Sequence, residues 1–225
     1  MSDSRQRVVP VSDTGRVEAF SDGVLAIVIT LLVLDLRPPD VDPGGLLSGL
    51  LAQWPGYLAY FTSFHYVAVI WLNHHATFRR VRFIDRPLHW ANLGILFTTA
   101  LLPFPTAVVS QALQREDLAD ARTAVGLYAL VGVLLCASWL VFFEYVSRHP
   151  QLVEDDVEEG FFRRECTRAW AGIAGYVAAG VLGVLLVPLV GFVIFLCLTV
   201  FYGFTSHGLA RLPYPRRPGR RTTSS

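Results

Sequence analysis

Six long apolar segments alternate along the chain with short breaks that are charged or rich in proline and glycine. A helix needs roughly 20 apolar residues to cross a hydrocarbon core about 30 Å thick, and each segment is about that long. The pattern therefore predicts an all-α integral membrane protein with six transmembrane helices per chain. We place these helices at residues 17–36, 50–72, 88–113, 122–146, 167–187 and 189–209.

Only Pro188 separates the last two segments, so they could form one kinked helix or two helices. Together they are about twice as long as a single crossing requires, which favours two helices.

The arginines are divided unequally between the two sides of such a membrane protein. All 19 basic residues are arginine, and with six crossings only Arg37, Arg115 and Arg122 fall on one side. The other side carries Arg5, Arg7, Arg16, Arg79, Arg80, Arg82, Arg86, Arg148, Arg163, Arg164, Arg168, Arg211, Arg216, Arg217, Arg220 and Arg221. Because cytoplasmic loops carry the excess of positive charge, we expect a multi-pass protein of the cell membrane with both termini in the cytoplasm.

Composition agrees with this class and excludes a soluble domain. Hydrophobic residues make up 53% of the 225 residues and charged residues only 16%, which is more apolar surface than a soluble core of this size can bury. We predict one six-helix transmembrane domain over residues 1–210 and a disordered basic tail over 211–225. The tail could touch anionic lipid or nucleic acid, but a solvated tail that sets the topology is favoured, and we expect no nucleic-acid partner.

Motifs of enzymes and metal sites do not occur in the sequence. The cysteines Cys136, Cys166 and Cys197 are far apart and form no CxxC pair, so we expect neither a metal site nor a disulfide framework. HExxH and GxSxG patterns are also lacking. We therefore expect no enzyme activity and no cofactor.

The first apolar segment carries an apolar stripe along its whole length. At about 100° per residue the stripe is roughly 60° wide, with Thr30 at its edge, Asp22 nearly opposite and Ser21 to one side. On general grounds such a stripe is more often a packing seam than the wall of a pore. Its members are Arg16, Phe20, Gly23, Ile27, Leu31 and Leu34.

Charged residues in this segment require partners if they lie within the membrane. Arg16 and Asp22 are costly there unless they are paired or wetted. Candidate partners at the end of the second segment are Trp71, Asn73, His74 and His75. We predict one polar cluster of Arg16, Asp22 and one of the two histidines. The alternative is that Arg16 and Asp22 meet water at the headgroup level.

The motif Arg16-x-x-x-Phe20-Ser21-Asp22-Gly23 resembles the RxxxFSDG signature of the potassium channels named for the lysosomal transmembrane protein 175, in particular their short prokaryotic members. The likeness covers the first half of the chain well. It continues through Ala26-Ile27, Thr30-Leu31-Leu32, Trp71-x-x-His74-His75-x-x-Phe78, Asn92-Leu93 and Leu102-Pro103-Phe104-Pro105.

The resemblance implies a homotetramer of six-helix subunits with four first helices around a central pore, embedded in membrane lipid and passing potassium ions. It implies a constriction formed by Ile27, Leu31 and Leu34, with the Thr30 hydroxyl beside the path. It also implies that Arg16, Phe20, Ser21, Asp22, Trp71, His74 and His75 form the packing and hydrogen-bonding network that holds the first helix. Animal members carry two six-helix repeats, whereas this chain carries one and should need four copies.

A proton-coupled secondary transporter is the alternative, with Asp22, His74 and His75 as a proton relay. Such a transporter predicts broken helices at matching positions of two halves. The prolines at 103, 105 and 188 do not match in this way, and no TVGYG-like filter of ordinary potassium channels is present. A channel with apolar constriction rings is therefore favoured.

Overall fold

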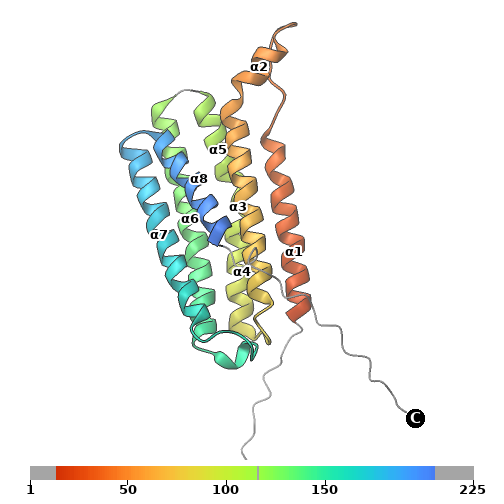
Figure 1. Cartoon of the computed structure of the whole chain (residues 1–225). Coiled ribbons are helices and arrows are strands. Elements are labelled where there is room, and N and C mark those ends of the chain that lie inside the picture. The colour runs from red at the N-terminus through yellow and green to blue at the C-terminus, as the bar shows by residue number, and fades with distance from the viewer. Residues whose placement is uncertain (1–13, 116, 206–225) are drawn as a thin grey trace, which may run out of the picture.

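The computed structural model describes residues 14–115 and 117–205, where the regular structure is helical apart from one isolated bridge between Val81 and Val153. Most helices lie side by side in one bundle (Figure 1). The predictions for Arg5, Arg7 and the tail at 211–225 fall outside the described residues. The elements are α1 (Thr14–Leu31), η1 (Leu32–Asp35), α2 (Leu46–Ala52), α3 (Trp54–Phe78), α4 (Arg86–Ala100), α5 (Pro103–Gln114), α6 (Leu118–Ser147), η2 (Pro150–Leu152), α7 (Phe161–Leu185) and α8 (Pro188–Thr205).

Four helical segments in the described ranges are long and apolar enough to cross a membrane: Thr14–Asp35, Arg86–Gln114, Leu118–Ser147 and Phe161–Leu185. α8 is apolar but shorter. α3 has 25 residues and carries polar side chains along its length. The outward faces of the bundle expose large apolar side chains such as Phe97 and Leu185, as a lipid-facing surface requires. The chain is thus an all-α membrane protein, as predicted.

Proline determines where two of the predicted segments divide. The predicted helix 88–113 is two helices, because α4 ends at Ala100 and α5 begins at Pro103. Pro103 has no N–H to donate, and the chain makes a tight turn in which the N–H of Leu102 donates to the carbonyl of Thr99. Pro188 begins α8 after α7 has ended, so the predicted separation of the last two helices is confirmed.

The connection between the first two long helices differs from the prediction. The predicted helices at 17–36 and 50–72 leave residues 37–49 outside any helix, but the chain forms α2 from Leu46 and then begins α3 at Trp54, with Pro55 in its first turn. α2 projects beyond the end of the bundle (Figure 1). Its leucines, including Leu47 and Leu51, are largely exposed in the single chain.

One end of the bundle gathers most of the arginines in the described ranges. The Thr14 hydroxyl at the start of α1 donates to the carbonyl of Arg82 over 3.1 Å. In the same place the N–H of Arg82 donates to Leu152 and that of Glu154 to Arg80. The start of α1 and the loops 79–85 and 148–160 therefore meet, and we call this the arginine-rich end. Arg37 and Arg115 line a cavity at the opposite end.

Candidate functional site

α1 has one face inside the bundle and one face outside it. Leu25, Val28 and Leu32 are at most 2% exposed, and they pack with the core against α3 and α4. On the other face, Ile27 is 60% and Leu34 is 66% exposed. The predicted stripe therefore faces away from its own chain, and α1 lies at the edge of the bundle (Figure 1). The exposed members are Arg16, Phe20, Gly23, Ile27, Thr30, Leu31 and Leu34.

The geometry of α1 changes near its end. After Leu31 the helix continues as the 3₁₀ helix η1, Leu32–Asp35. Because side chains at i and i+3 eclipse in a 3₁₀ helix, this tightening brings Leu34 into line with Leu31. At Gly23 a Cβ atom would meet nothing within 4 Å, so the stripe has an open position between Phe20 and Ile27.

The Thr30 side chain is bonded to its own helix. Its hydroxyl lies 2.8 Å from the carbonyl oxygen of Ile27 and 3.1 Å from that of Ala26. A hydroxyl has one proton to donate and two lone pairs to accept. The oxygen of Thr30 therefore remains an acceptor on the exposed face.

Three polar contacts hold the inner face of α1. The first is buried: the Asn92 amide donates to the Ser21 hydroxyl over 3.0 Å, and its oxygen lies 2.9 Å from Nε2 of His74. Ser21 and His74 are both fully buried and Asn92 is 2% exposed. This contact joins α1 to α4 and α3, so α1 cannot turn about its axis without leaving buried polar groups unpaired.

The second and third contacts are closer to the surface. Trp71 donates from Nε1 to Asp22 over 3.0 Å, and Nδ1 of His75 lies 2.8 Å from Glu18. The Trp71 and His75 rings stack on each other with centroids 6.1 Å apart. Both contacts join α1 to the last turns of α3, and they fix the first three turns of α1 near the arginine-rich end.

The structure connects the predicted polar residues in a different pattern from the single cluster expected. Within the part of the chain described, no hydrogen bond or ion pair joins Arg16 to Asp22 or Asp22 to either histidine. Arg16 and Phe20 lie on the exposed face. His74 and His75 each have a contact of their own, with Asn92 and Glu18. The cluster containing Arg16 therefore stays a prediction, one that contacts within a single chain do not supply.

Sequence reasoning gave no role in this site to two residues that the structure brings to α1. Asn92 bridges Ser21 and His74, and Glu18 pairs with His75. The sequence did contain a sign of both roles. Asn92 is an amide within an apolar segment and Glu18 is a carboxylate one turn before Asp22, and both kinds of group need partners in a membrane.

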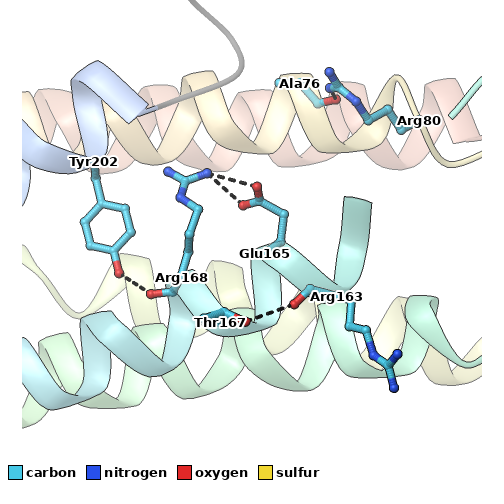
Figure 2. Close-up of polar contacts among 7 residues, drawn as sticks. All are labelled: Ala76, Arg80, Arg163, Glu165, Thr167, Arg168 and Tyr202. Atoms are coloured by element: carbon cyan, nitrogen blue, oxygen red, sulfur yellow. Dashed lines mark hydrogen bonds and ion pairs between the residues drawn. The ribbon is translucent and has the colours of Figure 1, made fainter. Parts of the chain in front are cut away.

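A second group of charges lies inside the bundle at the arginine-rich end. Figure 2 shows Glu165 and Arg168 of α7 side by side, with Nη1 of Arg168 at 3.0 and 2.8 Å from the two carboxylate oxygens. The Tyr202 hydroxyl of α8 donates to the carbonyl of Arg168 over 2.8 Å (Figure 2). Burial lowers the pKa of the nearby Arg80 guanidinium, and the Glu165 carboxylate opposes that shift.

Comparison with known proteins connects this helix arrangement to a family. Residues 16–103 match the family described as endosomal/lysosomal potassium channel TMEM175. A Streptomyces collinus protein named as a potassium channel is 38% identical over 92% of this chain and 97% of its own length. The human endosomal/lysosomal proton channel TMEM175 is 37% identical over 55% of this chain and 27% of the human protein.

A solved structure shares the fold. The crystal structure of a lysosomal potassium-selective channel TMEM175 homologue from Chamaesiphon minutus matches with a TM-score of 0.74 and 32% sequence identity. The match covers 86% of this chain and 97% of the other.

Proposed function

Because this chain belongs to the TMEM175 family of ion channels, we propose that it is the subunit of a homotetrameric, potassium-preferring cation channel whose four α1 helices line the pore. The family is not an enzyme class. The relative from Streptomyces collinus, which this chain matches over nearly its whole length, is named a potassium channel.

The observation that carries the proposal is the exposure of one apolar stripe on a helix whose other face is anchored. Ile27, Leu31 and Leu34 are 60%, 42% and 66% exposed. The buried bridge from Ser21 through Asn92 to His74 holds the stripe in that direction. Around a four-fold axis the stripe would form successive apolar rings, about one turn apart.

The proposed assembly has six crossings per chain. α3 has 25 residues, enough for one crossing, although its polar residues make it less apolar than the four candidate spans. α8 supplies the sixth, and the arginine-rich end is then cytoplasmic together with both termini. In this arrangement residues 1–210 form the channel domain and 211–225 a basic cytoplasmic segment.

Selectivity in such a pore rests on ring width and on the Thr30 oxygens. Rings of leucine and isoleucine offer no oxygen to replace an ion's hydration shell, so they control conduction by the cost of a dry gap. The Thr30 hydroxyl donates to the backbone of its own helix, which leaves its oxygen available to a cation or to the water around one. Potassium ions pass transiently, and no resident cofactor is required.

Cysteine scanning of α1 in liposomes tests the proposal. Cysteines at 27, 31 and 34 should react with a water-borne thiol reagent that blocks potassium flux, whereas cysteines at 28 and 32, which are buried in the bundle, should not. Equal reactivity at all five positions would make the stripe a lipid-facing or packing surface. Strict coupling of potassium movement to protons would instead support the alternative, a proton-coupled transporter.

A further inference from the structure

The short helix α2 has an apolar face that the single chain leaves open. Its four leucines are all exposed, and Leu47 and Leu51 are 70% and 66% exposed. At about 100° per residue the four side chains fall within one arc of about 140°. An apolar face of this kind on a protein surface marks a contact with another molecule. The leucines are Leu46, Leu47, Leu50 and Leu51.

The start of α3 shows that α2 lies outside the membrane-spanning part of the bundle. A Cβ atom at Gly56, in the first turn of α3, would lie 3.0 Å from the amide nitrogen of Gln114, the last residue of α5. The start of α3 is thus level with the end of the candidate span Arg86–Gln114. Trp54 is exposed at this level, as an aromatic side chain at a membrane–water interface is. α2 precedes Trp54 and projects further from the bundle (Figure 1), so hydrocarbon does not cover its leucines.

The opposite face of α2, which carries its small residues, is in contact with the loop before the helix. A Cβ atom at Gly49 would lie 2.8 Å from a side-chain carbon of Val41 and 2.9 Å from one of Pro39. The Ser48 hydroxyl donates to the carbonyl of Gly45 over 2.8 Å. The loop therefore covers the glycine side of α2 and leaves the leucine side for a different partner.

The charges and the size of α2 indicate what that partner is. A helix that binds along a membrane surface is typically rich in lysine and arginine on its polar face. α2 has no charged residue, and the loop before it carries Asp40 and Asp42. A separate protein needs about 800 Å² on each side of a standard interface, and two turns of helix offer much less. The leucine face can be covered stably only as part of a larger interface.

Such a larger interface is the one that α1 makes with its copies in the proposed channel, on which this inference rests. The exposed face of α1 extends to Leu34, and only residues 36–45 connect η1 to α2. Because α1 of each subunit faces the four-fold axis, this short connection keeps α2 of each subunit close to the same axis. The leucine face of α2 therefore continues the surface by which the copies meet.

We propose that the four α2 helices pack on one another as a collar around the mouth of the pore opposite the arginine-rich end. Contacts around a four-fold axis join two different patches of neighbouring subunits. The leucine arc has two edges that suit this arrangement. The edge formed by Leu46 and Leu50 packs against the edge formed by Leu47 and Leu51 of the next subunit, and the collar helps to hold the tetramer together.

Cysteine crosslinking in membranes tests the collar. Cys197→Ser removes the exposed native cysteine, and Cys136 and Cys166 are buried. In this background Leu47→Cys treated with a short bismaleimide should convert most of the protein to covalent dimers on a denaturing gel. Leu185→Cys is the matched control, because Leu185 is also 70% exposed but ends α7, on the far side of the bundle from α1 (Figure 1). This control should remain monomeric on the gel.

A pair of polar substitutions measures what the collar contributes to assembly. Leu47→Gln combined with Leu51→Gln should lower the fraction of tetramer several-fold at low protein concentration, as measured by light scattering after size exclusion. Leu185→Gln should leave the tetramer fraction unchanged. Because these leucines are exposed in the single chain, the helical content by circular dichroism should equal that of the wild type in both proteins.

The failure of the collar and the failure of the proposed channel give different results. If the wild type is a tetramer but Leu47→Cys forms no more dimer than Leu185→Cys, the collar is wrong and the proposed pore stands. Quenching of a fluorophore on Leu51→Cys by brominated lipid would place the leucines in the membrane and would also overturn the collar. A monomeric wild type in membranes would overturn the proposed channel and the collar with it.

Discussion

α1 and α7 both bring charged and polar groups into a membrane-length helix, but they satisfy these groups in opposite ways. In α7 the pair Glu165 and Arg168 lies within one turn of the same helix. In α1 the polar groups Glu18, Ser21 and Asp22 bond to side chains of α3 and α4. The orientation of α7 does not depend on its own ion pair, whereas the orientation of α1 depends on its neighbours. A helix that must present one face outward needs such external anchors.

The largest effect we expect is from breaking the internal pair of α7. Glu165→Gln leaves the guanidinium of Arg168, whose side chain is 19% exposed, without its carboxylate, at a cost of about 3–5 kcal/mol of unfolding free energy. Thermal unfolding of the purified protein should show a clear loss. Glu158→Gln removes an exposed partner of Arg164 and is the control, because exposed pairs contribute little. Equal Tm changes in both variants would contradict the expectation that the buried pair contributes more to stability than the exposed pair.

The second prediction separates the two faces of α1 by adjacent residues. The Leu32 side chain is fully buried, so Leu32→Ala leaves a cavity in its place and should cost about 2–5 kcal/mol of unfolding free energy. Leu31→Ala changes an exposed side chain and should leave stability nearly unchanged while it raises cation flux and weakens discrimination between potassium and sodium. Ile27→Asn should wet the same gap with the same result. The contrast fails if Leu31→Ala and Leu32→Ala lose stability equally or if Leu31→Ala leaves flux unchanged.

The third prediction removes the buried anchor of α1. Asn92→Leu leaves Nε2 of His74 without its partner and removes the bond that Ser21 accepts, while Ser21 still donates to the carbonyl of Val17. One unpaired buried group costs about 1–3 kcal/mol. We expect a lower yield of tetramer on size-exclusion chromatography together with a lower Tm. Gln111→Leu replaces an exposed amide of α5 and should behave as wild type. A normal tetramer yield for Asn92→Leu would show that apolar packing alone orients α1.

The smallest effect concerns the anchor nearer the surface. Trp71→Phe keeps an aromatic ring against His75 but removes the N–H donated to Asp22, a loss of about 1 kcal/mol. Trp90→Phe, on an indole that is 65% exposed, serves as the comparison. The difference between the two Tm values isolates the contact with Asp22, and Asp22→Ala should reproduce the effect of Trp71→Phe.

Sequence periodicity predicted the stripe of α1 but could not say which way it faces. Leu25, Val28 and Leu32 are as apolar as Ile27 and Leu31, so both faces satisfy the same helical pattern. The difference lies in Ser21, whose partner Asn92 is 71 residues away. Which helices are neighbours is a property of the whole bundle, and for the same reason the partners of His74 and His75 could not be read from the first and second segments.

The breaks in the helices were predictable where proline forms them and not elsewhere. Pro188 divides α7 from α8 because its missing N–H ends the hydrogen-bond ladder, and this division was predicted. Pro103 and Pro105 are the same kind of signal, but the apolar run continues through them and hid the turn between α4 and α5. α2 could not be predicted, since its leucines are continuous in pattern with the helix that follows.

The open position at Gly23 has an electrical consequence in the proposed tetramer. Four glycines leave the widest ring of the stripe there, so water that passes the Phe20 ring from the arginine-rich end extends up to Ile27. The dry stretch from Ile27 to Leu34 is then about 12 Å long, much less than the roughly 30 Å of the hydrocarbon core. Because water-filled segments take the potential of the solution they join, most of the membrane voltage falls over this stretch. An ion that crosses the whole stretch from Ile27 to Leu34 would therefore move through most of the membrane voltage, and the full voltage is worth about 2.3 kcal/mol per charge for each 100 mV.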